Sequence, residues 1–304
     1  MMAPVYRLNA AGASATDGKV RLAPIKIIWT GGMIIAFFVL APSNTNLPAV
    51  LTGFALTYIT LLFGHSVGLH RMMIHRSFKA KPWLRNSLIY LGTLVGIGGP
   101  SAVINTHDVR DWAQRAETCH DFFAHRRGYL RDLSWQLFYQ FKFKAPPEVK
   151  IEPELQNNPF IQHIDHFWRW HQLGFGLILI LVGGLPFLVW GLFFRVPISI
   201  IGHWTVTYIC HNPGPGRWDV ISNGVQASNL RLPAWISGWL THGECWHNNH
   251  HAFPESARIG LYAGQIDPAG RVIEKLEHLG LVYDVGVPRD DISDLRLRAP
   301  LPKS

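Results

Sequence analysis

Long apolar blocks separated by short polar breaks dominate the chain. The first two blocks are joined by the break from Pro42 to Pro48, and the last two by a tight turn at Arg195–Pro197. The first two blocks are near the lower limit of the ~17–25 residues that a helix needs to cross the hydrocarbon core of a bilayer, and the block from Leu173 to Phe194 is the most convincing span. We therefore expect four transmembrane helices in two hairpins, at about residues 27–41, 49–68, 173–194 and 198–211.

The apolar segment from Leu84 to Ile104 is interpreted differently, because glycines and a proline interrupt it. A full span at this place would put His107 on the opposite side of the membrane from His70 and His75. We therefore expect a re-entrant or interfacial segment, which is tolerated only where protein or water covers the backbone.

The remaining segments are polar, aromatic and basic, and they predict a cap of amphipathic helices. Helical patterns run from about Leu130 to Phe143, from Pro159 to Trp170 and near Arg271 to Leu279, whereas residues 146–153 predict a surface loop. The fold class expected is an all-α integral membrane protein, in which four transmembrane helices carry a cytosolic helical cap.

Composition and charge agree with this class. The 304 residues are 48% hydrophobic and 16% charged, and soluble domains are about 25% charged. Arg195 is the only one of the 28 lysines and arginines in either outer turn, so the positive-inside rule places both termini and the cap in the cytoplasm. We expect a bacterial inner-membrane protein. Its net charge of +8 suits an anionic membrane face, an acidic partner or a phosphorylated substrate.

Three units of organisation follow from these patterns. One membrane domain is expected at residues 26–290, between a flexible N-terminal tail at residues 1–25 and a C-terminal tail at residues 291–304.

Histidines carry the strongest chemical signal. His247, His250 and His251 have the spacing i, i+3, i+4, which puts three imidazoles on one face of a helix, next to Glu244. The alternative is a polar helix end at the membrane surface. A histidine-rich site with few carboxylates suits iron, copper or zinc better than magnesium or calcium.

Further histidines lie on the same expected side of the membrane. They are His70 and His75 after the second block, His107 with His120 and His125 downstream of it, and His211 at the end of the last block. Each group alone is a weak signal, because such pairs also occur by chance at interfaces. Together they predict a shared metal site.

Two motifs resemble those of the integral-membrane fatty acyl desaturases of the stearoyl-CoA desaturase type. Residues 68–80, GLHRMMIHRSFKA, resemble that family's first histidine box, and residues 243–254, GECWHNNHHAFP, resemble its third. The resemblance covers about residues 48–284. It implies four membrane helices under a cytosolic cap, and a di-iron centre that uses O2 and two external electrons to remove two hydrogens from an acyl chain. The iron ligands that it implies are His70, His75, His107, His211, His247, His250 and His251.

The second box departs from the family pattern. Where the family has HxxHH, this chain has His107-Asp-Val-Arg110-Asp111, and Thr207 stands in place of a ligand asparagine. Arginine cannot coordinate a cation. We expect Asp111 to take the ligand position, with Arg110 holding it from behind. The rivals are a surface ion pair between the two, or replacement by a spare histidine; the spare histidines are His65, His120, His203 and His242.

The resemblance implies a desaturase acting on acyl-CoA or an acyl lipid. The alternatives are a membrane lipid hydroxylase with the same iron chemistry and a non-catalytic metal-binding homologue. A separate electron carrier of the ferredoxin, rubredoxin or cytochrome b5 type is expected, and no nucleic acid. Arg71, Arg76 and Lys79 suit a phosphate-bearing substrate head group, although ordinary positive-inside anchoring explains them equally well.

Overall fold

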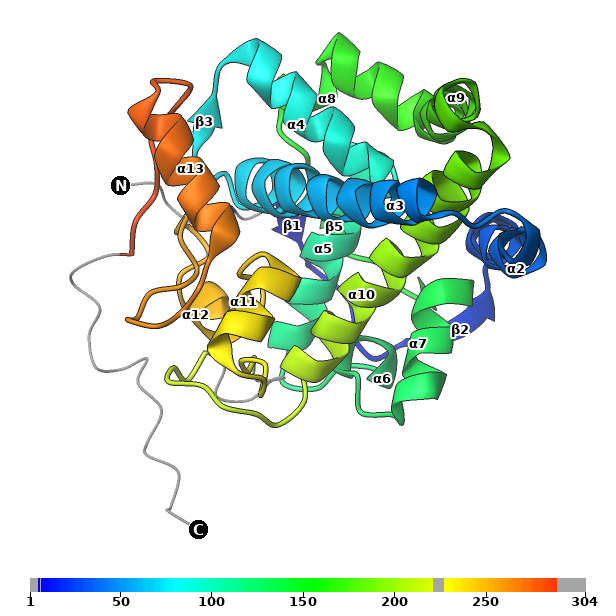
Figure 1. Ribbon diagram of the computed structural model, residues 1–304. Coiled ribbons are helices and arrows are strands. Elements are labelled where there is room, and N and C mark those ends of the chain that lie inside the picture. The colour runs from blue at the N-terminus through cyan, green and yellow to red at the C-terminus, as the bar shows by residue number, and fades with distance from the viewer. Residues whose placement is uncertain (1–4, 6, 221–226, 289–304) are drawn as a thin grey trace.

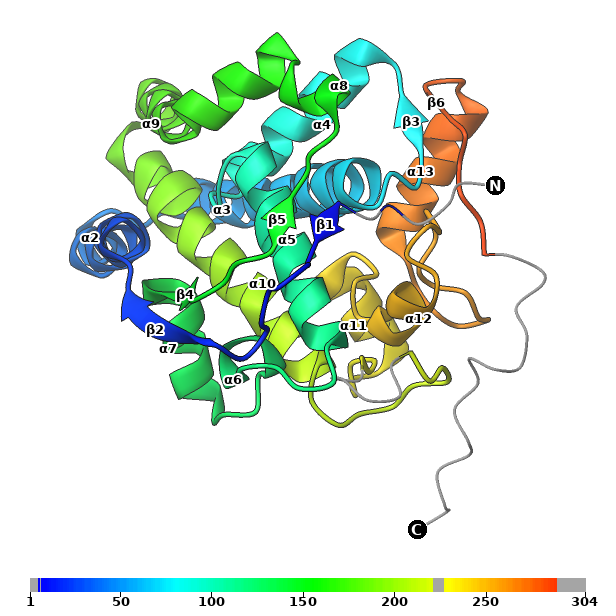
Figure 2. The same ribbon diagram turned by 180° about the vertical axis from the view of Figure 1, so that it is seen from behind.

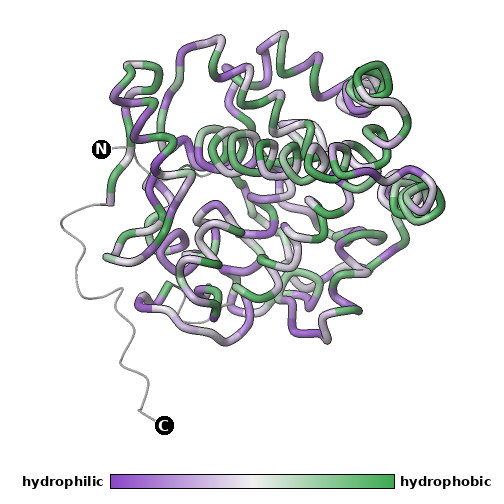
Figure 3. The backbone as a smooth tube through the Cα atoms, in the orientation of Figure 1, coloured by the Kyte–Doolittle hydropathy of each residue, from purple (hydrophilic) through white to green (hydrophobic). Residues whose placement is uncertain are grey.

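Three long helical stretches organise the protein. The computed structural model describes residue 5 and residues 7–220 and 227–288. Within these, three stretches are long and apolar enough to cross a membrane: Pro24–Ser43, Leu47–Ile74 and Pro159–Cys210. The trace coloured by hydropathy shows long apolar runs along α2, α3 and α9 (Figure 3). The protein is thus mostly helical and has membrane-like helices, as the apolar blocks predict.

The first two stretches form a helical hairpin. Asn46 begins the second stretch, and its side-chain oxygen accepts a hydrogen bond from the Ala49 amide at 2.9 Å, which satisfies one of the free N–H groups of the first turn. The elements in order are α1 (Pro24–Lys26), η1 (Ile27–Gly31), α2 (Gly32–Leu40), η2 (Ala41–Ser43), α3 (Leu47–Ile59) and η3 (Thr60–Ile74). η3 has wider, π-type turns and is buried along nearly its whole length. Its histidines, His65 and His70, therefore lie in the interior of the protein.

The third stretch is not one straight helix. It comprises α9 (Pro159–Leu188), η4 (Val189–Phe194) and α10 (Arg195–Cys210), and the backbone leaves helical geometry at Gly183 and Gly184, where Gly184 has φ 72° and ψ −166°. The turn expected at Arg195–Pro197 is therefore wrong, because the helix continues through it and the chain reverses at the glycine pair. Positive φ of this kind is open to glycine and strained for other residues.

Arg195 lies inside the protein and not on an outer turn. Its side chain is fully buried; it donates to the Gln172 side-chain oxygen at 2.8 Å, to the Gly191 carbonyl at 2.7 Å and to the Leu94 carbonyl. A charge at membrane depth is tolerated when backbone and side-chain oxygens solvate it in this way. The arginine thus ties α9, α10 and α4 (Pro82–Leu94) together.

The segment expected to be re-entrant or interfacial resolves into two helices. α4 packs along η3, and α5 (Pro100–Arg115) runs back past it after a turn that contains Gly96 at φ 88°. The contact between α4 and η3 is close because Gly64 and Gly92 face each other there. This packing forms the main apolar core, which continues into α13 (Pro268–His278).

Residues 7–25 are held against the protein, which corrects for these residues the flexible tail expected at residues 1–25. β2 (Gly18–Leu22) pairs antiparallel with β4 (Tyr139–Phe143), and β1 (Leu8–Asn9) pairs with β5 (Glu148–Val149), as the view from behind shows (Figure 2). Arg7 is 5% exposed and donates to the carbonyls of Met73 and Ile74. These pairings join distant segments, so local sequence patterns do not indicate them. The tail expected at residues 291–304 lies outside the described residues.

Outside the three long stretches, the described residues form short helices and little strand. The helix expected at 130–143 ends at Phe138, because β4 occupies residues 139–143, and the helix expected at 159–170 is the first part of α9. The helix near Arg271 to Leu279 is confirmed as α13. The remaining described elements are α6 (Asp121–Ala124), α7 (Tyr129–Phe138), α8 (Pro153–Gln156), α11 (Ala234–Thr241), α12 (His247–Ala252), and the paired strands β3 (Lys79–Ala80) and β6 (Val282–Tyr283).

Candidate metal centre

Histidines from four separate segments meet where the membrane-like helices join the cap. The donors come from η3 and its end, from α5, from the end of α10 and from α12 (Figure 1). They form two groups, and within each group the candidate donor atoms lie within 4.8 Å of one another. The first group is His70, His75, His107 and His250; the second group is His211, His247 and His251.

One short helix serves both groups. His247 and His251 are four residues apart on α12 and point into the second group, whereas His250 points into the first. The turn between α11 and α12 sets the direction of α12, and it contains two residues with positive φ, His242 at 59° and Gly243 at 99°. The three histidines of α12 are therefore shared between two neighbouring groups. The sequence alone suggested that all three face one site.

The spacing of the ring nitrogens suits metal ions. His70 Nε2 lies 3.2 Å from His75 Nε2, and His247 Nε2 lies 3.0 Å from His251 Nε2. Two nitrogens bound to one ion at about 2.0–2.1 Å each are separated by about 3 Å. The imidazole pairs thus already have the separation that a shared ion requires.

Among the seven grouped histidines, two buried ring nitrogens have neither a hydrogen-bond nor an ion-pair partner among the described residues. They are Nε2 of His211 in the second group and Nδ1 of His250 in the first. An unpaired buried polar atom costs stability, and a bound cation at each group would satisfy it. The residues present therefore fit a pair of metal ions.

Oxygen atoms hold the outer nitrogen of several of these histidines. Such partners fix the tautomer and the ring orientation of a ligand histidine and raise its basicity. The pairs, from Nδ1 to oxygen, are His70 with Glu244 at 2.9 Å, His211 with the Thr207 carbonyl at 2.9 Å and His107 with Asp108 at 3.2 Å. In each pair the other nitrogen is left for the metal. Asp111 lies 3.7 Å from Nδ1 of His251, which is too far for a hydrogen bond.

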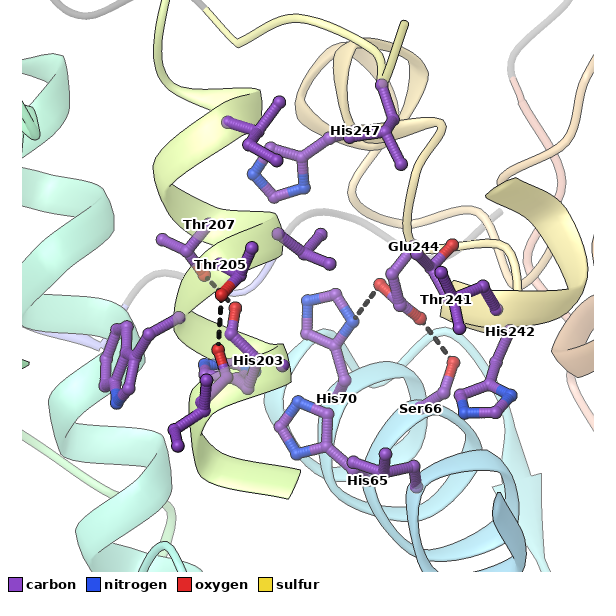
Figure 4. Close-up of a pocket in the computed structure, with 18 of the residues that line it drawn as sticks. His65, Ser66, His70, His203, Thr205, Thr207, Thr241, His242, Glu244 and His247 are labelled. Atoms are coloured by element: carbon purple, nitrogen blue, oxygen red, sulfur yellow. Dashed lines mark hydrogen bonds and ion pairs between the residues drawn. The ribbon is translucent and has the colours of Figure 1, made fainter. Parts of the chain in front are cut away.

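Glu244 is the most firmly held of these partners. Its carboxylate pairs with His70 and accepts a hydrogen bond from Ser66 (Figure 4). It also pairs with Arg71 at 3.3 Å. Burial opposes its ionisation, but attraction to His70 and Arg71 outweighs burial and holds the pKa of Glu244 well below its usual range. The first group thus has a permanent negative charge directly behind one of its ligands.

Arg110 does not hold Asp111, which corrects that expectation. Its guanidinium donates to His125 Nε2 at 2.7 Å and to Gln136 Oε1 at 2.8 Å, and lies 4.5 Å over the Trp204 ring. Burial lowers the pKa of Arg110 to about 10, so it stays protonated at neutral pH. Arg110 therefore adds a fixed positive charge beside the second group.

Asp111 lies next to the second group but outside the three donors that converge there. One carboxylate oxygen lies 3.7 Å from Nδ1 of His251, and the other pairs with Arg115 at 3.1 Å. Since Nε2 of His251 faces His247, the carboxylate approaches the ring from the opposite side. Asp111 is therefore placed to interact with the candidate ligand His251 from the side away from the metal.

The spare histidines divide into two kinds. His65, His203 and His242 line the cavity beside the first group, and the His65 and His203 ring centroids are 4.7 Å apart. His120 lies away from both groups, where Nδ1 caps α6 at the Phe122 amide. His120 is therefore not brought to the centre. Thr207 contributes its backbone carbonyl to His211, and its hydroxyl bonds back to its own helix.

The cations expected at a substrate head group have other partners. Arg71 is 1% exposed and donates to both carboxylate oxygens of Asp267 at 2.9 and 3.0 Å, so the assignment of Arg71 to a head group is wrong. Arg76 pairs with Glu152 at 3.2 Å, and Lys79 pairs with Asp284 at 2.9 Å. None of the three lines the cavity.

His107 is supported by two residues that the sequence patterns do not single out, Asp108 and Arg7. Asp108 accepts from His107 and also pairs with Arg7 at 3.2 Å. Arg7 in turn holds the carbonyls of Met73 and Ile74, directly before His75. The acidic neighbour of His107 is a signal that could have been read from the sequence, but the contribution of Arg7 rests on long-range pairing and could not.

A large apolar cavity leads away from the two histidine groups. It has a volume of about 910 Å³ and is lined by residues of α3, η3, α5, α10 and α11, a size typical of ligand pockets of roughly 300–1,000 Å³. His70, His107, His247 and His251 lie on its wall. An apolar ligand in this cavity would therefore contact the candidate metal centre directly.

Comparison with known proteins agrees with this geometry. Residues 45–273 match the family model described as fatty acid desaturase. The chain belongs to the fatty acid desaturase family. This desaturase is 31% identical over 273 residues to the sn-1 stearoyl-lipid 9-desaturase of Anabaena variabilis, covering 89% of this chain and 96% of that protein.

Other relatives differ in the carrier that their names give for the acyl group. The desaturase is 30% identical to the acyl-CoA C20 Delta5-desaturase of Anemone leveillei, over 87% of this chain and 82% of that protein. It is 31% identical to the chloroplastic palmitoyl-monogalactosyldiacylglycerol delta-7 desaturase of Arabidopsis thaliana, over 83% and 66%. Family membership thus supports an acyl desaturase and leaves the carrier of the acyl chain to be determined.

Proposed function

We propose that this protein is an O2-dependent fatty acyl desaturase in which each histidine group holds one iron ion. The observation that carries the proposal is the convergence of seven histidines into two groups beside one apolar cavity. Five of these histidines lie on the cavity wall: His70, His107, His211, His247 and His251. When bound, the iron ions would activate dioxygen and supply an oxidising power that no side chain has. Two hydrogens from the acyl chain, two electrons from a separate carrier and two protons reduce one dioxygen to two waters.

The protein keeps the imidazoles ready to bind. Burial holds the pKa of His247, His250 and His251 well below the ordinary value, so these rings are neutral at neutral pH. Only a neutral imidazole has a lone pair for a metal. Glu244 and Asp108, behind the first group, add the negative charge that a pair of cations requires.

The cavity positions the acyl chain and excludes water. Its walls between α3 and α10 are aliphatic and aromatic, and they end at the histidine groups. Such walls pack against an acyl chain and place apolar side chains next to its C–H bonds. The depth to which the chain enters would decide which carbon pair lies opposite the metal ions.

Four spans with a cytoplasmic cap fit the position of the site. His107 lies before the stretch Pro159–Cys210 and His250 lies after it, yet both belong to the first group. The two ends of this stretch are therefore on the same side of the membrane, which supports two crossings joined at Gly183 and Gly184. Neither these glycines nor the first outer turn at 41–46 contains a lysine or arginine, so the positive-inside rule favours a cytoplasmic cap.

Product and metal analysis test the proposal together. We expect the purified protein to hold two irons per chain and, with O2 and a reducing system, to yield lipid with two hydrogens fewer. An oxygen added to the acyl chain would instead identify a hydroxylase. Bound metal without any oxidation of lipid would indicate a non-catalytic metal-binding homologue.

The variant His250→Ala links the histidine groups to this activity. Removing a donor from the first group should lower iron affinity by more than the ~10–100-fold that outer-shell changes cost, and should abolish desaturation. His278→Ala is the control, because His278 lies at the end of α13 and belongs to neither group. Full iron content in the His250→Ala protein would reject the assignment.

A further inference from the structure

The cavity reaches the surface at an apolar opening beside α11. Buried residues of this helix, Ser237, Gly238 and Thr241, face the protein. Trp235, Trp239 and Leu240 line the cavity and are nevertheless 65%, 56% and 67% exposed. Because these side chains belong to the cavity wall and the outer surface at once, the cavity opens here.

Two membrane-like helices complete the opening. Phe54 of α3 and Ile198 and Ile209 of α10 also line the cavity, and are 55%, 38% and 38% exposed. All three belong to the candidate membrane spans, and α11, α10 and α3 lie on the same side of the molecule (Figure 1). We call these six residues the apolar mouth: Phe54, Ile198, Ile209, Trp235, Trp239 and Leu240.

The apolar mouth continues the lipid-facing surface of the spans. Its α11 side exposes two tryptophans within five residues, a residue type that concentrates where a membrane meets water. A short helix with an apolar outer face and a buried inner face lies in such an interface. The occupant that this surface fits is the bilayer itself.

Charge around the cavity argues against a soluble thioester carrier. Apart from histidines, the charged residues on its wall are Arg110, Asp111 and Glu244, and each already has a partner within the protein. Coenzyme A carries several phosphates, and clustered lysines and arginines recognise such groups. Among the described residues, no such cluster lines the cavity.

An exposed arginine lies next to residues of the cavity wall in the sequence. Arg231 is exposed and stands between Leu230 and Leu232, which both line the cavity. No ion pair joins Arg231 to another described residue. The positive charge of Arg231 suits the negative charge of a phosphodiester, the head-group linkage of a membrane phospholipid.

We propose that the substrate is an acyl chain still esterified to a membrane phospholipid, and that it enters sideways from the bilayer through the apolar mouth. α11 lies in the membrane interface, and Arg231 contacts the lipid phosphate. This inference rests on the proposed desaturase function and names the carrier of its substrate. It also explains why the cations predicted for a head group are paired elsewhere.

Substrate presentation provides the first test. Purified protein with both irons, O2 and a reducing system is given phosphatidylcholine vesicles or stearoyl-CoA. We expect desaturation of the vesicle lipid and little of the thioester. In Trp235→Ser/Trp239→Ser, turnover of vesicle lipid should fall at least about tenfold, since each large apolar side chain contributes more than a tenfold factor when buried in lipid. Trp83→Ser is the control, because Trp83 is 59% exposed on α4 and does not line the cavity.

Membrane depth provides a second test that needs no catalysis. A spin label at Trp239→Cys in vesicles should be accessible to lipid-dissolved oxygen and protected from a water-soluble nickel complex. The same label at Lys275→Cys on the exposed face of α13 should show the reverse. The three native cysteines are buried, so the label reports the engineered site.

The outcomes separate the two proposals. Desaturation of stearoyl-CoA with no conversion of phospholipid, or a water-exposed label at position 239, overturns sideways entry and leaves the desaturase function standing. If the iron-loaded protein oxidises neither lipid, the proposed function fails, and the spin label still decides whether α11 lies in the membrane. Turnover of vesicle lipid that is unchanged in the double tryptophan variant also overturns the apolar mouth.

Discussion

Single residues give the two histidine groups different surroundings. The first group has four histidines, and carboxylates of Glu244 and Asp108 stand behind two of them. The second has three histidines, a backbone carbonyl behind His211 and the positively charged Arg110 nearby. Because fewer donors and less negative charge surround it, the second group should bind its cation more weakly. The negative charge of Asp111, next to His251, offsets this difference in cation binding between the two groups.

Asp111→Asn should weaken the second metal site without removing it. The amide keeps the shape of Asp111 but loses the negative charge 3.7 Å from His251 Nδ1, a change of the kind that costs ~10–100-fold in metal affinity. During titration with a chelator, we expect one of two irons to leave the variant earlier than it leaves the unmodified protein.

Asp121→Asn is the matched control for this charge change. Asp121 pairs with Arg127 on the surface, and its side chain is 40% exposed. If Asp111→Asn is purified with a single iron, and Asp111→His restores the second, Asp111 is a direct ligand, as the sequence suggests. Chelator resistance equal to that of Asp121→Asn would show that Asp111 has no part in the site.

In the third long stretch, a few residues decide where the helix continues and where it breaks, against what polarity and proline usually indicate. Arg195 and Pro197 read as a polar turn, yet both are buried in a helix, because carbonyls and Gln172 solvate the arginine. The wider turns of η4 directly before them accommodate the missing proline N–H. The actual break lies at Gly183 and Gly184, inside a run so apolar that hydropathy alone does not show it.

Gly184→Ala should destabilise the protein by about 1–3 kcal/mol, the usual cost of a conformation that is essentially restricted to glycine. The backbone there has φ 72° and ψ −166°. Thermal unfolding in detergent, followed by circular dichroism, should show a lower midpoint. Gly174→Ala is the comparison, because its added Cβ meets no atom within 4 Å and alanine is the better helix former. Equal midpoints for the two variants would place the chain reversal elsewhere.

For the whole molecule, the sequence indicates the chemistry better than the architecture. His247, His250 and His251 are recognisable from spacing, because a helix fixes the relation of residues three and four apart. The pairing of residues 18–22 with 139–143 and the reach of Arg7 to Asp108 depend on contacts more than 90 residues apart. No local pattern encodes such contacts. The packing of distant segments around the site is therefore visible only in the structure.

The position of the site makes the topology of the whole chain testable. Since His107 and His250 share one group, we expect residues before α9 and after α10 to lie on one side of the membrane, and the turn at residues 41–46 on the other. Single cysteines at Ser43, Lys144 and Lys275 should report this, because all three positions are exposed and the native cysteines are buried. In intact cells, a membrane-impermeant maleimide should label Ser43→Cys only, and lysis should add the other two. If Lys144→Cys and Lys275→Cys were labelled from opposite sides, the stretch Pro159–Cys210 would cross once, and the two histidine groups could not form as the structure has them.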